Sequence, residues 1–355
     1  MVTILDCIER IPSVIENILE RQEEAFGPFM NYVKEHIDEI NEIVFIGSGT
    51  SNTSAVTSQP FVEKASGICT KIALPNNYAG EIFNLNPNAL YVFTSQTGTS
   101  KVVCQVMEKL SAKGCHCLSM TEAPDTKLAK ISHWHVCLNC GMEEHLMRTI
   151  GYVSSVLNHM LLGMKLGLAK GHITKEQYDA YLEDAKRVPD SHRVITEQTK
   201  TWFQKNKFQI IRSKCVIFTG TGSLYGVALE GAVKFWEMPQ FISAGYELEE
   251  GMHGPNYGYD GNHCIVVLND GGSESDKALS LARYMKEVFH NGLVAGTKVV
   301  DEQDLMLDIK GGDFACLEFS AVPQIIAYYL AVDSGRDISK LIDHTLMYSY
   351  FNTHS

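Results

Sequence analysis

The sequence lacks any uninterrupted apolar run long enough to span a bilayer, although apolar residues make up 45% of its 355 residues. Its first residues, MVTILDCIERIPSVIENILERQ, predict an amphipathic helix that mixes acidic and basic side chains. They also lack the basic start, apolar middle and small-residue cleavage site of a signal peptide. We therefore expect a cytoplasmic protein with no membrane among its partners.

Positive charge is scarce too, since 30 Lys and Arg residues face 42 Asp and Glu residues and the net charge is −12. Nucleic acids and anionic membranes attract basic surfaces, so this balance disfavours both as partners. A small phosphorylated ligand remains compatible with it, because backbone amides at a helix N-terminus and nearby hydroxyl groups can hold one phosphate.

Metal-ligand motifs are few. The ten cysteines are scattered along the chain, and we expect them to be reduced. The segment HWHVCLNC places Cys137 and Cys140 at metal-ligand spacing, close to His133 and His135. Its alternation also fits a β-strand, and no second Cys/His pair of the usual spacing follows. We favour the strand and expect neither a metal nor another cofactor.

Two segments of the chain repeat one pattern. EIVFIGSGTSNTSAV and KCVIFTGTGSLYGVALEG each contain a strand-like run, a Gly-x-Gly turn and a small-residue helix start. Gly47 and Gly49 of the first segment match Gly220 and Gly222 of the second. Further strand–turn–helix patterns follow in both halves. The sequence therefore predicts an α/β protein with two similar domains, each a doubly wound parallel sheet flanked by helices.

The predicted organisation has five parts. In chain order they are an N-terminal helical segment, a first α/β domain, linking helices, a second α/β domain and a C-terminal tail, with boundaries at 1–34, 35–170, 171–205, 206–335 and 336–355.

Two hydroxyl-rich loops, GSGTSNTS and TSQTGTS, each follow a predicted strand of the first domain. Ligands of parallel sheets bind beyond the carboxyl ends of strands, where such loops meet helix N-termini. Ordinary capping and turn chemistry is the alternative for either loop alone, but two of them favour a phosphate site. Neither loop contains the Gly-Lys-Ser/Thr of a nucleotide P-loop, and the Gly-x-Gly turns lack the third glycine of a dinucleotide fingerprint.

The stretch ALEGAVKFWEM predicts a short apolar helix with three charged residues. Glu230, Lys234 and Glu237 stand at i, i+4 and i+7 and therefore share one helical face. A solvated polar stripe with an ion pair would explain this spacing, and so would a catalytic group.

The segments GSGTS, TSQTGTS, ALEGAVKFWE and HGP occur in this order and resemble the sugar isomerase (SIS) domains of phosphosugar enzymes. The pattern is most similar to the isomerase half of glucosamine-6-phosphate synthase, and the fructosamine-6-phosphate deglycases are related to it. The resemblance extends over roughly residues 35 to 340. It implies two SIS domains of flavodoxin-like topology and a small-molecule phosphosugar as the ligand.

The resemblance also implies roles for individual residues. Glu237 matches the carboxylate that moves a proton between sugar carbons C1 and C2, and Glu230 and Lys234 match its supporting residues. His253 matches the histidine that opens the sugar ring. In the family this histidine comes from the neighbouring subunit, so we expect a homodimer with shared active sites. The positions that match the substrate and phosphate loops are Gly49, Thr50, Ser51, Ser95, Gln96, Thr97 and Ser100.

The sequence departs from the synthase pattern at three points. No glutaminase half is present in it, so we expect no glutamine-dependent synthesis. Leu346 occupies the position of a tail lysine that forms a Schiff base in the synthase, and the nearby Lys340 is out of register. Ile150 replaces a second lysine at a helix start, where Thr149 matches the family.

These departures favour either a ketosamine 6-phosphate deglycase or a simple aldose–ketose isomerase, and the residues do not separate the two. A non-catalytic phosphosugar-binding regulatory protein is the alternative from another class. Such a sensor needs the phosphate loops but not a Glu/His pair, and no helix-turn-helix is evident in the sequence.

Overall fold

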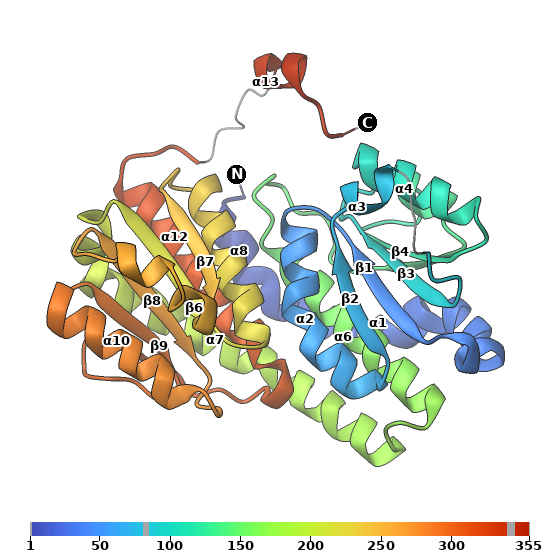
Figure 1. Ribbon diagram of the computed structural model, residues 1–355, viewed down its shortest axis with the longest axis horizontal. Helices are drawn as coiled ribbons and strands as arrows, with labels where there is room; N and C mark the ends of the chain where they lie inside the picture. The colour runs from blue at the N-terminus through green and yellow to red at the C-terminus, as the bar shows by residue number, and fades with distance from the viewer. Residues whose placement is uncertain (1, 81–84, 339–344, 355) are drawn as a thin grey trace. The chain divides into compact units, whose positions relative to one another are not determined.

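The computed structural model describes residues 2–80, 85–338 and 345–354 (Figure 1). The chain forms two compact units, and each unit contains one sheet. We call them the first unit and the second unit, in the order of their sheets. The first unit comprises 13–143, 150–182 and 341–355, and the second comprises 1–12, 144–149 and 183–340.

The first unit has a five-stranded parallel sheet in the order β2-β1-β3-β4-β5. The strand β3 is buried at all six positions, as expected for a parallel strand that is covered on both faces. The strands are β1 (Glu42–Ile46), β2 (Cys69–Ala73), β3 (Ala89–Thr94), β4 (His116–Thr121) and β5 (Trp134–Cys137). The helices are α2 (Thr50–Ser66), α3 (Asn76–Ala79), α4 (Lys101–Ser111), α5 (Lys127–Ile131), α6 (Ile150–Lys170) and α13 (Thr345–Tyr350), together with the 3-10 turn η1 (Ile37–Glu39).

The second unit has a parallel sheet in the order β10-β9-β8-β6-β7. Its strands are β6 (Cys215–Gly220), β7 (Ser243–Glu247), β8 (His263–Asn269), β9 (Gly292–Gly296) and β10 (Leu305–Met306). Its helices are α8 (Ser223–Glu237), α9 (Leu248–Gly251), α10 (Ser275–Phe289), α11 (Ala315–Phe319) and α12 (Ala321–Asp333), with the 3-10 turns η2 (Pro255–Gly258) and η3 (Gly312–Phe314). Two long helices contribute residues to both units, α1 (Ile4–His36) and α7 (Lys175–Ile211).

The two units have the same topology. When the strands of each sheet are numbered along the chain, both orders become 2-1-3-4-5, which is the flavodoxin-like order. The Gly-x-Gly turns also match, since φ and ψ are 57° and −129° at Gly49 and 53° and −126° at Gly222. The predicted α/β class, with two doubly wound parallel sheets flanked by helices, is confirmed.

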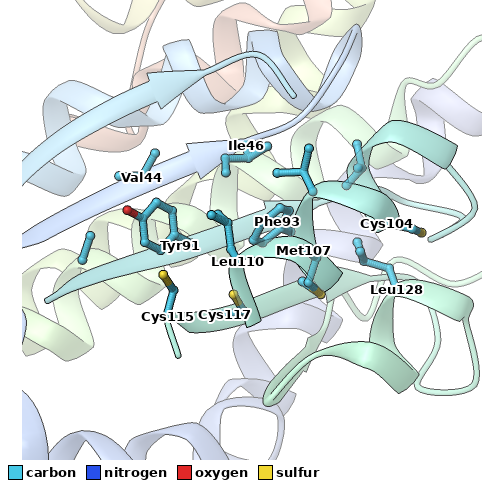
Figure 2. Close-up of a cluster of buried hydrophobic side chains, with 13 residues drawn as sticks. Val44, Ile46, Tyr91, Phe93, Cys104, Met107, Leu110, Cys115, Cys117 and Leu128 are labelled. Atoms are coloured by element: carbon cyan, nitrogen blue, oxygen red, sulfur yellow. The ribbon is translucent and has the colours of Figure 1, made fainter. Parts of the chain in front are cut away.

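A buried cluster packs one face of the first sheet against α4 and α5 (Figure 2). Tyr91 and Phe93 project from the central strand β3 and contact Met107 and Leu110 of α4 within this cluster. The buried positions of α4 recur every three or four residues and therefore form one apolar face of the helix. This face packs on the side chains that β3 presents on the same side of the sheet. This packing fixes the start of α4, which carries the second hydroxyl loop.

Two glycines bring α6 close to α2 in the first unit. A Cβ atom on Gly167 would lie 1.9 Å from the carbonyl oxygen of Ala65, and one on Gly163 would lie 2.9 Å from the Cα of Val62. These glycines are four residues apart and therefore share one face of α6. The helix that begins at the first hydroxyl loop is thus packed backbone to backbone on α6.

One segment departs from the expectation that no apolar run reaches membrane-spanning length. Gly312–Asp333 has 22 residues and a mean hydropathy of 1.4 over its best 18-residue window, enough by length and composition. However, 78% of that window is buried inside the structure. A buried core helix of a soluble protein passes the same test, and the burial of α11 and α12 agrees with that origin.

The segment around Cys137 forms a strand, as predicted, since β5 covers Trp134–Cys137. His135 Nδ1 lies 3.1 Å from the Ser119 hydroxyl, and the Cys137 thiol lies 3.4 Å from the Glu122 carbonyl oxygen. All ten cysteines are free. Within the described ranges, no group of three or more His, Cys, Asp or Glu residues could hold a metal ion.

Candidate functional site

The first hydroxyl loop joins β1 to α2 through a turn that requires glycine. Gly49 has a positive φ of 57°, and a Cβ on Gly47 would lie 2.8 Å from the Cβ of Ser51. The chain therefore turns sharply from the strand into the helix. Thr50 and Ser51 form the first turn of α2 and are half-buried, so this loop presents hydroxyl groups at a helix N-terminus.

The second hydroxyl loop joins β3 to α4. Ser95 Oγ lies 3.3 Å from Ser100 Oγ, and Thr97 Oγ1 lies 2.9 Å from Thr99 Oγ1. Gly98, with a φ of 63°, makes the turn at the centre of the loop, between Thr97 and Thr99. The structure therefore brings together the predicted residues Ser95 and Ser100 at the start of α4. Ser95 is 5% exposed, so a bound anion would contact it only from within the loop.

Thr94 and Gln96 lie deeper than the other residues of this loop. Thr94 is 2% exposed, and its hydroxyl lies 2.8 Å from His159 Nε2 in the core. Gln96 donates from Nε2 to Glu143 Oε2 at 3.3 Å, while its buried Oε1 has no hydrogen-bond partner. A Cβ on Gly151 would lie 1.8 Å from that Oε1 atom, so the Gln96 side chain is pressed against the start of α6.

Glu143 is a polar residue of this region that the sequence analysis missed. It is 6% exposed and accepts hydrogen bonds from the backbone amides of Ile150 and Gly151, both at 3.0 Å. Its carboxylate therefore caps the N-terminus of α6, where the helix dipole favours negative charge. An acid shortly before an apolar helix was the available signal. Ile150, which replaces a lysine of the synthase pattern, is itself buried here.

The C-terminal tail contacts the start of α4. The Lys101 amide donates to the carbonyl oxygen of Thr353 at 2.9 Å, and Ser100 forms an isolated antiparallel bridge with His354. The tail thus occupies one backbone donor of the candidate phosphate loop. Leu346 is 73% exposed in α13, and Lys340 lies outside the described residues.

The structure brings Glu230, Lys234 and Glu237 together on α8 of the second unit. Lys234 Nζ lies 3.2 Å from Glu230 Oε1 and 2.5 Å from Glu237 Oε2. The side chains of Glu230 and Lys234 are 1% and 0% exposed, whereas that of Glu237 is 33% exposed. The solvated stripe that the spacing also allowed is therefore wrong for Glu230 and Lys234, and only Glu237 reaches solvent.

Two carboxylates, those of Glu230 and Glu237, flank the buried ammonium of Lys234. Burial alone opposes the charged form of Lys234, but the attraction of Glu230 and Glu237 outweighs it and raises the pKa of Lys234 above its ordinary value. Lys234 is therefore a fixed positive charge rather than a proton donor near neutral pH. It holds the Glu237 carboxylate at the boundary between core and solvent.

The aromatic neighbours of Glu237 differ in burial. Phe235 is fully buried and packs edge-on against Phe218, with ring centroids 5.1 Å apart. Trp236 is 55% exposed and donates from Nε1 to the carbonyl oxygen of Ser243 at 3.0 Å. Phe235 therefore anchors α8 to β6, while Trp236 ties the end of α8 to Ser243, the first residue of β7.

His253 lies on an exposed loop that follows β7 and α9. Its side chain is 69% exposed, and Nδ1 lies 2.9 Å from the carbonyl oxygen of Glu249 and 3.5 Å from that residue's Oε1. Glu249 also pairs with Lys277 at 2.6 Å. The structure thus leaves the Nε2 side of His253 at the surface of its own unit, on a loop that turns at Gly254 with a φ of 112°.

Comparisons with known proteins agree with this architecture. A family model described as SIS domain matches residues 36–166 and 209–301. Glutamine–fructose-6-phosphate aminotransferase (isomerizing) of Helicobacter pylori strain J99 is 24% identical over 340 residues. That alignment covers 93% of this chain but 55% of the relative, so the chain spans about half the length of this curated relative.

Two solved structures share the whole fold. A candidate phosphosugar isomerase of Clostridium difficile 630 has a TM-score of 0.88 and 26% identity, with 98% of each chain covered. The C-terminal domain of glucosamine-fructose-6-phosphate aminotransferase from Francisella tularensis has a TM-score of 0.86 and 20% identity, covering 94% of this chain and 96% of that one. With matches in both sheets and the duplicated Gly-x-Gly turns, this chain belongs to the SIS domain family.

Proposed function

We propose that this protein is a sugar-phosphate enzyme that opens the ring of its substrate and moves a proton between C1 and C2. The observation that carries the proposal is the carboxylate of Glu237, one-third exposed and held 2.5 Å from the buried ammonium of Lys234. Taking an ion pair out of water is costly, so a buried pair that presents one carboxylate to solvent is a candidate functional group.

Glu237 is the proposed base. Aldose–ketose chemistry needs one group that removes a proton from one carbon and returns it to the next, and a fixed carboxylate suits this task. Lys234 would hold Glu237 in place, and Glu230 would in turn hold Lys234, since the buried ammonium lies 2.5 Å from Glu237 and 3.2 Å from Glu230. His253 is the proposed group for ring opening, because one imidazole nitrogen can donate a proton while the other accepts one.

The proposed phosphate ligands are in the first unit. Ser95, Thr97 and Ser100 surround the start of α4, and Thr50 and Ser51 stand at the start of α2. Hydroxyl groups and backbone amides at helix N-termini bind phosphate without a basic patch. Because the Lys101 amide is bonded to Thr353, a phosphate that uses this donor would displace the tail.

A ketosamine 6-phosphate is the substrate class that we favour. Removal of a proton from C1 of the open-chain ketosamine gives an enaminol, and delivery of a proton to C2 by the same carboxylate, after exchange with solvent, leaves a C1 imine. Water then adds to C1 and the amine leaves, giving a hexose 6-phosphate. This route needs no lysine Schiff base, in agreement with Leu346 and Ile150 at the two positions where the synthase pattern has lysines.

Plain aldose–ketose isomerisation is the second candidate, because it uses the same carboxylate and histidine on a sugar phosphate that carries no amine. We also propose that the enzyme acts in the cytoplasm as a homodimer, in which the exposed His253 completes the partner's site. A purely regulatory phosphosugar sensor would need neither Glu237 nor Lys234, so the pairing of the buried Lys234 with the partly exposed Glu237 favours an enzyme.

Time-resolved NMR of the purified protein with ketosamine 6-phosphates and with hexose 6-phosphates in deuterated water tests the proposal. We expect amine release from the first class, with solvent deuterium at C2 of the product. Deuterium exchange on hexose 6-phosphates alone would identify an isomerase. Binding of both classes without turnover would indicate the sensor. If only fructose 6-phosphate with glutamine or ammonia reacts, the favoured substrate class is wrong.

A further inference from the structure

A buried histidine connects the elements that carry the two hydroxyl loops of the first unit. His159 of α6 is 0% exposed. Its Nε2 lies 2.8 Å from Thr94 Oγ1, and its Nδ1 lies 3.1 Å from Ser58 Oγ. Thr94 is the last residue of β3, directly before Ser95 of the second loop, and Ser58 lies on α2, the helix that begins at the first loop.

The hydrogen bonds around His159 fit a neutral imidazole with its hydrogen on Nδ1. The Ser58 hydroxyl donates to the carbonyl oxygen of Ala55 at 3.2 Å, which leaves its oxygen free to accept from Nδ1–H. The unprotonated Nε2 then accepts the hydroxyl hydrogen of Thr94. Both ring nitrogens are used, one as a donor to α2 and the other as an acceptor from β3.

The surroundings of His159 keep the ring uncharged. Its neighbours are Ser54 and Ser58 of α2, Thr94 of β3 and the ring of Phe45 on β1, 4.3 Å away, and none of these side chains carries a charge. Burial lowers the pKa of His159 to about 3, and a backbone hydrogen bond with Ser54 opposes this only in part. The imidazole is therefore neutral at any pH at which the enzyme would be assayed.

We propose that His159 is a positioning residue for the phosphate site, because its imidazole ties the end of β3 to α2 and so fixes the two hydroxyl loops relative to each other. This inference rests on the proposed function, in which both loops bind the substrate phosphate. It does not place His159 in contact with substrate. Two hydrogen bonds from one rigid ring restrict the positions of Ser58 and Thr94 more than apolar packing alone would. If either loop is displaced, each contact between its hydroxyl groups and the phosphate becomes weaker.

The close packing of α6 on α2 supports this role. Gly163 and Gly167 bring the two helices together one turn and two turns beyond His159 on α6. Tyr152, two turns before His159, adds a 2.6 Å hydrogen bond to Thr57 of α2. The α2–α6 pair is therefore joined along its length, and His159 extends this interface to β3 through Thr94.

Binding of inorganic phosphate and of fructose 6-phosphate to His159→Leu and His159→Gln, measured by calorimetry, tests the proposal. We expect the Leu variant to bind both ligands about tenfold more weakly, the scale set by losing one or two hydrogen bonds. The Gln variant retains a donor and an acceptor and should recover part of the affinity. With substrate, KM should rise while kcat changes little, because His159 does not touch the reacting atoms.

The matched control is His192, a second fully buried histidine on α7 that lies in the second unit. Its Nδ1 lies 3.4 Å from Thr196 Oγ1 of the same helix, so it has no part in either hydroxyl loop. His192→Leu should lower stability but leave the dissociation constants for phosphate unchanged. Equal weakening in the two Leu variants would show a general effect of a damaged core and would overturn the proposal.

A further variant covers the case in which His159→Leu does not fold. Thr94→Val keeps the shape of the side chain and removes only the hydroxyl that bonds Nε2, and it should weaken phosphate binding severalfold. Folded His159 or Thr94 variants that bind phosphate as tightly as the wild type would overturn the positioning role. Wild-type protein that binds neither ligand would instead refute the phosphate site, and the two failures are therefore distinguishable.

Discussion

The ammonium of Lys234 and the carboxylate of Glu230 form an ion pair at 3.2 Å from which solvent is excluded, with side-chain exposures of 0% and 1%. Such a pair is expensive to form and more expensive to break. Glu230 and Lys234 are one helical turn apart on α8, so the helix itself sets the distance between their side chains. The pair is therefore a rigid support for the more exposed Glu237.

Lys234→Met should destabilise the protein by roughly 3–5 kcal/mol, because Glu230 would remain in the core without this cation. Urea unfolding of the variant checks this value. The double variant Lys234→Met, Glu230→Gln should recover much of the loss, since no charge then remains buried there. Lys277→Met removes two exposed ion pairs, with Glu249 and Glu274, and should leave the stability nearly unchanged because surface ion pairs contribute little. A similar small effect for Lys234→Met would contradict the burial of this pair.

Glu237→Gln should reduce kcat by roughly 10²–10⁴-fold and leave ligand binding largely intact. The amide preserves the shape of the side chain but cannot accept a proton from carbon. Steady-state kinetics with the substrate identified by NMR provide the measurement. Glu287→Gln, which changes an exposed carboxylate of α10, should retain full activity. Turnover by Glu237→Gln within threefold of the wild type would remove Glu237 from the mechanism.

Mixing inactive Glu237→Gln subunits with inactive His253→Ala subunits should restore part of the activity if active sites are shared. In a mixed dimer, one of the two sites would receive an intact Glu237 from one subunit and an intact His253 from the other. The exposure of the His253 side chain on its own unit is compatible with this arrangement. Subunit exchange is verified by mass spectrometry of differently tagged chains. Complete exchange without any recovery would mean that each site is built within one chain.

Gly167→Ala should cost roughly 1–3 kcal/mol of stability, the range for overpacking a well-packed core. Its Cβ would lie 1.9 Å from the carbonyl oxygen of Ala65, and backbone cannot move aside as a side chain can. The matched control is Gly27→Ala in α1, where a Cβ would meet nothing within 4 Å. That change should be neutral or stabilising by up to about 1 kcal/mol, because alanine favours the helix. Thermal unfolding of both variants decides the comparison.

The sequence predicted the strands that consist of apolar runs, such as β3, and helices in the segments MVTILDCIERIPSVIENILERQ and ALEGAVKFWEM, which lie largely within α1 and α8. It did not predict β7 or β9, with the sequences SAGYE and GLVAG. These short runs are rich in glycine and alanine and have no distinct periodicity. They become strands because each pairs along its whole length with a neighbour, β6 or β8, and that pairing is a tertiary effect.

The spacing of Glu230, Lys234 and Glu237 identified the shared face of α8 but not its burial. The burial of this helix depends on α12, which packs so closely that a Cβ on Gly231 would lie 2.8 Å from the Cβ of Pro323. No local pattern encodes this contact. For the same reason, nothing in the sequence around His159 indicated its partners Thr94 and Ser58, which lie 65 and 101 residues away along the chain.

The buried histidines should make stability depend on pH between about 6.5 and 5. Burial lowers the pKa of His159 to about 3 and that of His192 to about 4, whereas both ionise near 6.5 in the unfolded chain. The unfolded state therefore binds more protons in this range, so the stability contribution is present above pH 6.5 and is lost as the pH falls.

The expected loss is about 1.5 kcal/mol for each histidine between pH 6.5 and 5. Glu318, whose pKa is raised by burial, contributes with the opposite sign, and this contribution is common to the wild type and the histidine variants. Urea unfolding at several pH values should show a shallower pH dependence in His159→Gln and in His192→Gln, and the shallowest in the double variant. Equal slopes in all four proteins would show that these histidines are not held neutral in the folded state.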